Sequence, residues 1–303
     1  MLLFPLQTGE KEHHMKRIGF IGLGRMGSGI CHQLISKGYS TAVFDINATN
    51  LQAFAQIATI AADKKELLES SDVIFLSLPG SVQVEETVHE FISYGISGKT
   101  IIDLSTSYPL SSKELYHKVT AAGGFFADAS LTGTPTHAEQ GALIVTVGGD
   151  METYEDCLPI ISTFASRGVH YIGGPGAGNI AKLANNYLSI MYVALYAEIF
   201  PLAEKLGFDT QKLFEIIGQS GVSCPMYQSN GAKIVNKTYD PSFSLDFALK
   251  DITYVKRLFD EQQMPSFVLD GGLNLLRLGH LKGYGSNDLS EMARVTRELM
   301  EHE

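Results

Sequence analysis

The sequence predicts an α/β N-terminal domain with a mostly parallel sheet and an all-α C-terminal domain, joined by a long interdomain helix. Short apolar runs alternate with helical stretches as far as residue 172, which is typical of a parallel sheet covered by helices on both faces. A glycine-rich segment follows at residues 173–178, and only helical patterns come after it. We therefore expect domains at residues 15–177 and 178–303, with residues 1–14 as a disordered extension.

The composition argues against several functional classes. The net charge is −10 and there is no dense run of Lys or Arg, so neither nucleic acid nor a membrane surface is an expected partner. The most apolar segment, residues 187–203, contains a glutamate and a proline and is too short to span a membrane. Cys31, Cys157 and Cys224 lie far apart with no CxxC pair. We expect reduced thiols, a cytoplasmic location and no metal site.

The elements of the N-terminal domain follow from the alternating pattern. Strands are expected at residues 17–21, 41–44, 73–78, 100–103, 125–129, 143–147 and 169–172, where short apolar runs occur. Helices are expected at residues 28–37, 51–55, 82–91, 111–122 and 151–162. Gly38 ends the first helix as a C-cap glycine does. The first strand, first helix and second strand therefore form a strand–turn–helix–strand unit.

The C-terminal domain is expected to contain helices alone. Helical patterns occur at residues 179–206, 210–219, 247–261, 266–278 and 288–300. The first of these is apolar nearly all round, which predicts that it is buried.

A glycine-rich turn between the first strand and the first helix predicts a dinucleotide site. It has the pattern GxGxxG in the required context, with an acidic residue after the next strand. Gly22 permits the tight turn, Gly24 lets the backbone approach a pyrophosphate, and Gly27 allows close packing of helix on strand. The free N–H groups of the helix favour phosphate. The cofactor-binding residues predicted here are Gly22, Leu23, Gly24, Arg25, Met26 and Gly27, and the domain is predicted to be Rossmann-type.

Asp45 lies at the end of the second strand, 18 residues after Gly27. Its carboxylate can accept hydrogen bonds from a ribose diol and repels a 2′-phosphate, and neither Ile46 nor Asn47 offers a cation. The sequence therefore predicts NAD in preference to NADP. A simple turn role for Asp45 is the alternative.

Two further strand ends are expected at the same edge of the sheet, because ligands bind at the carboxyl ends of parallel strands. Leu78 and Pro79 follow one strand, and Thr106 lies in the loop after another. We predict that all three contact the cofactor. An ordinary turn or N-cap role stays open for each loop.

The start of the long helix carries the strongest catalytic signal. Lys182 and Asn186 are four residues apart, so they share one face of an otherwise apolar helix. Burial disfavours an ammonium, and so does the positive end of a helix dipole, so both effects would lower the pKa of Lys182 toward that of a general acid/base. Asn186 can hold the same substrate hydroxyl, with Asn185 beside it as a substrate-binding candidate. The alternative is a snorkelling lysine and an interhelical asparagine.

Residues 128–141 form an unusual loop rich in Ser, Thr and Gly. Ser130, Thr132, Gly133 and Thr134 offer hydroxyl and N–H groups that could bind a carboxylate. His137 also lies in this loop, and solvation is its ordinary role.

These stretches, taken in order, resemble the β-hydroxyacid dehydrogenase family from about residue 16 to 299. The resemblance rests on the glycine turn, LSTS at 104–107, GxGxxxKxxxN at 176–186 and the pair Lys250-Asp251. It implies interconversion of a small 3-hydroxy acid and its semialdehyde, of the 3-hydroxyisobutyrate, tartronate semialdehyde or succinic semialdehyde type. It further implies Lys182 as the catalytic acid/base with Asn186 as its partner. Lys250 would bind on the nicotinamide side of the cofactor, and the protein would be a homodimer or homotetramer.

One stretch departs from the family pattern. Thr132-Gly133-Thr134 stands where the family usually has Ser-Gly-Gly. Thr132 keeps a hydroxyl, whereas Thr134 adds a side chain and leaves the identity of the substrate open, a sulfolactaldehyde-type substrate included. Two other functions stay open: a phosphogluconate-like decarboxylating dehydrogenase and a non-catalytic NAD-binding regulatory protein.

Overall fold

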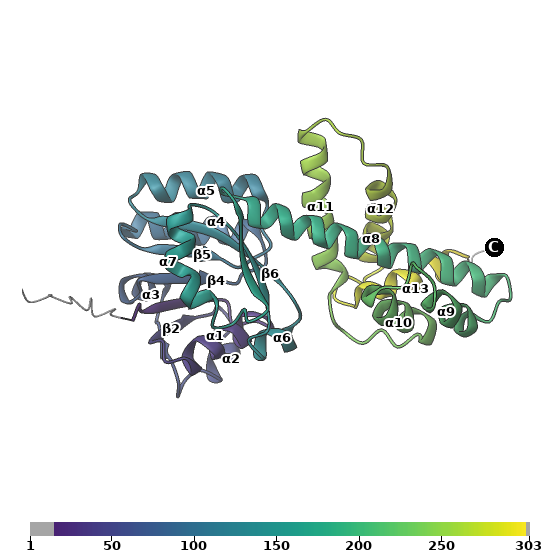
Figure 1. Ribbon diagram of the computed structural model, residues 1–303, viewed down its shortest axis with the longest axis horizontal. Coiled ribbons are helices and arrows are strands. Elements are labelled where there is room, and N and C mark those ends of the chain that lie inside the picture. The colour runs from purple at the N-terminus through teal and green to yellow at the C-terminus, as the bar shows by residue number, and fades with distance from the viewer. Residues whose placement is uncertain (1–14, 301–303) are drawn as a thin grey trace, which may run out of the picture. The chain divides into compact units, whose positions relative to one another are not determined.

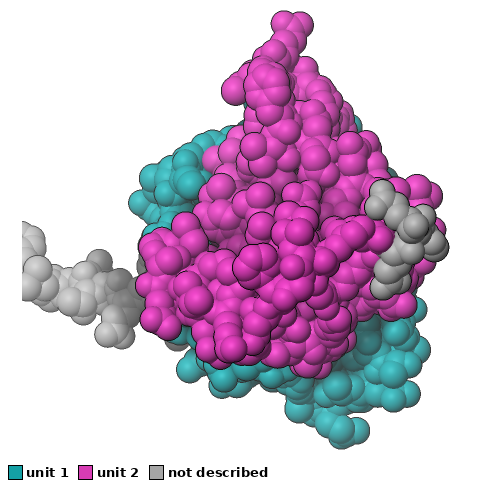
Figure 2. Space-filling view, turned by 90° about the vertical axis from the view of Figure 1, so that its right-hand side faces the viewer, with its two compact units in different colours: residues 1–175 teal, residues 176–303 magenta. Residues whose placement is uncertain are grey.

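The computed structural model describes residues 15–300 (Figure 1), so the extension expected at residues 1–14 lies outside the described residues. The chain divides into two compact units, residues 1–175 and 176–303, which Figure 2 colours separately. The division falls inside the glycine-rich segment that the sequence singles out. The described residues contain no helix long and apolar enough to cross a membrane.

Unit 1 is built on one eight-stranded sheet with the order β3-β2-β1-β4-β5-β6-β7-β8. Its strands are β1 (Ile18–Ile21), β2 (Thr41–Phe44), β3 (Thr59–Ile60), β4 (Val73–Leu76), β5 (Thr100–Asp103), β6 (Phe125–Thr132), β7 (Ile144–Gly148) and β8 (Gly168–Gly173). All neighbouring pairs are parallel except β6 and β7. The fold class predicted from the alternating pattern is therefore confirmed.

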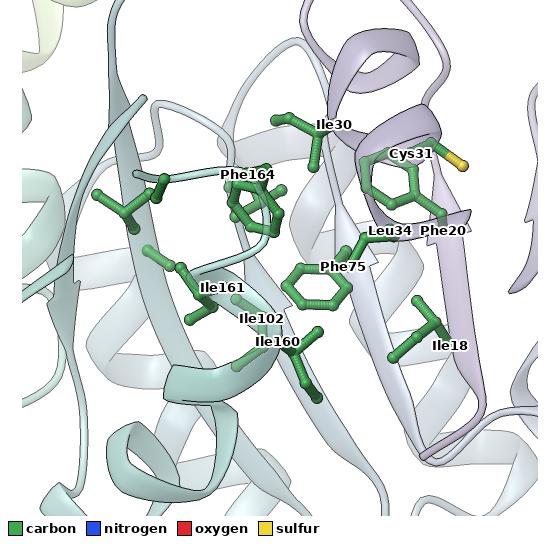
Figure 3. Close-up of a cluster of buried hydrophobic side chains, with 14 of the residues drawn as sticks. Ile18, Phe20, Ile30, Cys31, Leu34, Phe75, Ile102, Ile160, Ile161 and Phe164 are labelled. Atoms are coloured by element: carbon green, nitrogen blue, oxygen red, sulfur yellow. The ribbon is translucent and has the colours of Figure 1, made fainter. Parts of the chain in front are cut away.

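Helices cover both faces of this sheet. They are α1 (Gly27–Ser36), α2 (Ala48–Gln52), α3 (Lys64–Ser70), α4 (Ser81–Tyr94), α5 (Pro109–Ala121), α6 (Pro135–Glu139) and α7 (Met151–Ile161). Along β4, Val73 and Phe75 join a buried cluster with α1 and α7, shown in Figure 3, whereas Ile74 and Leu76 join a second cluster with α3, α4 and α5. The strand is apolar at every position because both of its faces are buried.

Local patterns do not predict three elements of unit 1. Strand β3 has only two residues, and both are exposed. Helix α3 is also missed, and α6 lies within the segment that was expected to be a loop. Strand β6 runs further than predicted, to Thr132, because its second half pairs antiparallel with β7. Ser130 and Thr132 therefore lie on a strand and not in a loop.

Unit 2 consists of helices, and the structure shows no strand among its described residues. They are α8 (Ala177–Lys205), α9 (Thr210–Gly218), a π-helix (Tyr227–Gly231), α10 (Ala232–Asn236), α11 (Leu245–Glu261), α12 (Phe267–Leu281), a 3₁₀ turn (Leu289–Glu291) and α13 (Met292–Met300). The sequence pattern misses the π-helix and α10. It also reads the 3₁₀ turn and α13 as one helix.

The prediction that the long helix is buried is correct for one side of the helix and wrong for the others. One side of α8 packs into the core of unit 2 through Ile190, Val193 and Phe200. On other faces Leu188 and Leu195 remain 55% and 54% exposed. The helices of a unit of this size cover only part of the surface of a helix that is 29 residues long.

Candidate active site

The glycine turn has the geometry that a dinucleotide needs. Gly22 has φ +95°, and a side chain there would place its Cβ 2.1 Å from the carbonyl oxygen of Ser77. At Gly27, the first residue of α1, a Cβ would lie 1.9 Å from the carbonyl oxygen of Gly22. A Cβ on Gly24 would meet no atom within 4 Å. Two of the glycines are therefore required by the fold, whereas the third leaves open space beside the backbone for a ligand.

Asp45 supports this turn from the end of the neighbouring strand. Its Oδ2 accepts a hydrogen bond from the Leu23 amide at 2.7 Å, and its Oδ1 accepts one from the Asn47 amide at 2.7 Å. The Asn50 side chain donates to Oδ2 at 3.2 Å. Asp45 is therefore more than a local turn residue, because it joins the carboxyl end of β2 to the glycine turn. A carboxylate has about four acceptor positions, so capacity for a ribose hydroxyl remains.

The other predicted cofactor-binding loops lie at the same edge of the sheet, because β1, β4 and β5 are parallel and in register. The amide of Leu78 donates to Oγ of Ser105 at 2.9 Å. Fully buried Asp103 accepts from the Ser105 amide at 2.8 Å and from Oγ of Ser107 at 2.7 Å. The loop around half-buried Thr106 is therefore held rigidly beside Leu78, and Pro79 next to it is exposed. Asp103 was not predicted as the anchor of this loop.

The segment expected to bind the acid group follows the same edge. Ser130 is buried within β6 and Thr132 is its last residue. Gly133 has φ +143°, and Thr134 caps α6. The amide of Thr134 lies 3.1 Å from Nδ1 of His137, and its hydroxyl lies 2.8 Å from the same atom. The side chain that departs from the family pattern is therefore fixed by His137, a contact that the sequence does not predict.

In unit 2, Lys182 and Asn186 lie on α8. Lys182 is half-buried, and its pKa is lowered chiefly by burial, with a smaller contribution from the positive charge of Lys250. The negative charge of Asp251 acts in the opposite direction. Lys182 is the sixth residue of α8, beyond the first turn. Burial therefore accounts for the lowered pKa, and the helix dipole, which acts within the first turn, is not needed.

Asn186 belongs to a buried polar cluster between α8 and α11. Its Nδ2 donates to Oδ2 of Asp251 at 2.6 Å, and its Oδ1 accepts from Nδ2 of exposed Asn185 at 3.3 Å. Lys250 Nζ lies 3.1 Å from the other oxygen of Asp251 and 5.2 Å from the centre of the Tyr254 ring. The predicted residues Asn186 and Lys250 are thus brought together at one carboxylate, and Lys182 lies one helical turn before Asn186 on α8.

That carboxylate is the principal residue that sequence reasoning missed. Asp251 was noted only as the neighbour of Lys250, yet it is 2% exposed and lies on the buried stripe of α11 with Ala248, Ile252 and Val255. An acidic residue at a core position of an amphipathic helix was the available signal, because a buried charge needs a partner.

The comparisons with known proteins identify the family of the chain. Residues 17–173 match the family model described as the NAD binding domain of 6-phosphogluconate dehydrogenase. Residues 176–296 match the model described as NAD-binding of NADP-dependent 3-hydroxyisobutyrate dehydrogenase. The chain belongs to the β-hydroxyacid dehydrogenase family.

The relatives of this chain include dehydrogenases that are named for hydroxy acids. The chain is 30% identical to the mitochondrial 3-hydroxyisobutyrate dehydrogenase of Drosophila melanogaster, over 95% of this chain and 90% of the relative. It is 28% identical to a 2-(hydroxymethyl)glutarate dehydrogenase of Eubacterium barkeri, over 93% and 95%. A solved 3-hydroxyisobutyrate dehydrogenase of Mycobacterium tuberculosis with L-serine has the same fold, with a TM-score of 0.85, 24% identity and coverage of 93% and 99%. Unit 1 is therefore an NAD(P)-binding Rossmann-type domain of an oxidoreductase family.

Proposed function

We propose that the protein is an NAD-dependent oxidoreductase that interconverts a small 3-hydroxy acid and its semialdehyde, with Lys182 as the general acid/base. The observation that carries this proposal is the buried hydrogen bond from Asn186 to Asp251, one helical turn after Lys182 on α8 and beside Lys250. A family member that only bound a nucleotide would need the glycine turn and Asp45 but no amine of lowered pKa. We further propose a cytoplasmic homodimer or homotetramer.

The residues of unit 1 fit a dinucleotide. The turn from Gly22 to Gly27 would hold the pyrophosphate, with open space at Gly24, and Asp45 would accept from the ribose. Leu78, Pro79 and Thr106 border the same edge, and Lys250 of unit 2 would contribute a cation. Asp45 favours NAD, because a carboxylate repels a 2′-phosphate. The nicotinamide, when bound, accepts or supplies the hydride.

Lys182 transfers a proton to or from the reacting oxygen. In the reduction direction its ammonium donates a proton to the oxygen of the former carbonyl group, which becomes the alcohol. In the oxidation direction the neutral amine takes the hydroxyl proton. A lowered pKa suits this exchange, because the ammonium then releases its proton more readily than that of an ordinary lysine.

Asn186 orients that oxygen. One N–H of its amide is directed at Asp251, which leaves the second N–H as a donor to the substrate oxygen. Asn185 lies beside it as a further polar contact.

The acid group of the substrate would bind at Ser130, Thr132, Gly133 and Thr134. The hydroxyl of Thr132 and the amide of Gly133 are donors there, and Thr134 narrows the space relative to a glycine. The 3-hydroxyisobutyrate, tartronate semialdehyde, succinic semialdehyde and sulfolactaldehyde types each have one acid group separated by one or two carbons from a primary alcohol or aldehyde. We propose this class as the substrate.

A substrate panel tests the proposal. The purified protein is incubated with C3 to C5 semialdehydes and with NADH or NADPH in parallel, and loss of reduced cofactor is followed by its absorbance. We expect turnover of at least one semialdehyde, faster with NADH. Binding of NADH without turnover of any compound would instead support a non-catalytic regulatory protein. In a second arm, with hydroxy acids and oxidised NAD or NADP, release of carbon dioxide would support a decarboxylating enzyme.

A further inference from the structure

We propose that Asp251 is a positioning residue for the reaction: it fixes the amide of Asn186 and supplies the negative charge that holds the Lys182 amine ready to carry a proton. This inference rests on the proposed function and extends it to a residue that acts through Asn186 and Lys182 and not by touching the substrate.

A buried hydrogen bond joins Asp251 on α11 to Asn186 on α8. Asp251 is 2% exposed and Asn186 is 8% exposed, so their hydrogen bond of 2.6 Å is shielded from water. A hydrogen bond from an amide N–H to a carboxylate is stronger than one between two neutral groups, because the acceptor is ionised. It fixes which end of the Asn186 amide is the donor, because the nitrogen must face the carboxylate. Without it, the amide could rotate and present its oxygen to the substrate.

Asp251 also places a negative charge beside positively charged groups of unit 2. Lys250 Nζ lies 3.1 Å from its Oδ1, and Lys182 lies on α8 one helical turn before Asn186, which is hydrogen-bonded to the same carboxylate. Oδ1 of Asp251 accepts no well-directed hydrogen bond from the described residues, although Lys250 Nζ lies 3.1 Å from it. Of the charges that act on Lys182 from the described residues, Asp251 is the anion and Lys250 the cation, and both lie on or beside the buried stripe of α11.

Loss of the negative charge of Asp251 would change the pKa of Lys182 in one direction only. Burial and Lys250 both disfavour the ammonium form of Lys182, and Asp251 alone of these three favours it. Removal of the negative charge therefore lowers the pKa of Lys182 further. The protein would then hold Lys182 as a neutral amine at lower pH, which impairs proton donation in the reduction direction first.

The test separates the charge of Asp251 from its hydrogen bond. Asp251→Asn keeps an acceptor for the Asn186 amide but removes the charge, whereas Asp251→Ala removes both. Each protein, without cofactor or substrate, is acetylated with a trace of acetic anhydride over a range of pH. Mass spectrometry then compares the labelling of Lys182 with that of exposed Lys37. Only neutral amines react, so the midpoint reports the pKa of Lys182.

We expect Asp251→Asn to lower the pH at the labelling midpoint of Lys182 by about one pH unit or more, which is a tenfold change in proton concentration. This is the effect of losing one nearby opposite charge. The control is Asp260→Asn, which removes an exposed carboxylate of the same helix that pairs with Lys256, and it should leave the midpoint unchanged. Equal midpoints in Asp251→Asn and wild type would overturn the role of the charge.

The catalytic readout tests the role of the hydrogen bond. In the reduction direction the basic limb of the kcat profile should move to lower pH in Asp251→Asn, and Asp251→Ala should lose about a further tenfold in kcat with little change in cofactor affinity. Equal kcat in the two variants would overturn the positioning role. If wild type reduces no semialdehyde, the proposed function fails, yet the labelling result still decides the charge effect.

Discussion

The glycine turn of unit 1 allows a prediction that separates folding from cofactor binding. Gly27 and Gly24 belong to the same motif, but the structure gives them different roles. An alanine at position 27 would place its Cβ 1.9 Å from the carbonyl oxygen of Gly22 and 3.1 Å from Phe20 Cε1. An alanine at position 24 would meet no atom within 4 Å, and its backbone needs no left-handed conformation.

The magnitudes follow from these contacts. Gly27→Ala forces backbone to move, and overpacking of this kind destabilises by about 1–3 kcal/mol. For a unit of this size each kcal/mol lowers Tm by about 2–4 °C, so a fall of several degrees is expected. Gly24→Ala should leave Tm within about 1 °C. It should weaken NADH binding by at least about tenfold, or about 1.4 kcal/mol, because the methyl occupies the space that the pyrophosphate needs.

The assay combines thermal unfolding without ligand and calorimetric titration with NADH; the chain has no tryptophan, so quenching of intrinsic tryptophan fluorescence is not an option. The control is Gly271→Ala, on α12 of unit 2, where an added Cβ also meets open space. It should leave NADH affinity unchanged. Wild-type NADH affinity in Gly24→Ala, or an unchanged Tm in Gly27→Ala, would refute the reasoning.

Three further predictions concern single side chains. Asp45→Ala should weaken NADH binding more than NADPH binding, so that the two Kd values, measured by calorimetry, become more nearly equal. An unchanged ratio of these Kd values would contradict the role of Asp45 in cofactor choice. Thr134→Gly should alter KM for the semialdehyde severalfold while the Kd for NADH stays constant, because a cap lost to glycine destabilises by only a few tenths of a kcal/mol; an unchanged KM would remove Thr134 from the substrate site. Lys182→Met should stabilise the protein near neutral pH, because the pKa of Lys182 is lowered on folding and the folded state binds the proton less well than the unfolded state does. The free energy of unfolding should rise by about 1.4 kcal/mol for every tenfold by which folding weakens proton binding to Lys182. This gain is complete below the pKa of Lys182 in the folded state, and it disappears as the pH rises toward the ordinary lysine pKa of 10.5. Denaturant unfolding at several pH values measures it, and a gain that grows with pH would contradict the sign.

The sequence predicts best the features that depend on local order. The strands at 41–44 and 100–103 agree with the structure residue for residue, because each is a short apolar run with a turn at its end. The turn from Gly22 to Gly27 could be read in the same way. Strand β3 could not, since two exposed residues carry no apolar pattern and pair only because β2 lies beside them.

The site is harder to predict because its contacts join distant residues. Asn186 and Asp251 are 65 positions apart, and Asp45 and Leu23 are 22 apart. Periodicity reveals that Asp251 lies on the buried stripe of α11, but not which residue of α8 it meets. The same limit explains the error on α8: an apolar helix is buried only where other helices cover it, and the sequence does not state how many do.

The proton-transfer role of Lys182 is tested most directly by the turnover number of Lys182→Ala at saturating NADH and semialdehyde, measured with the Kd for NADH. We expect a kcat lower by about two orders of magnitude or more, with the Kd nearly unchanged, because the amine transfers a proton and does not bind the cofactor. A kcat close to that of wild type would contradict it.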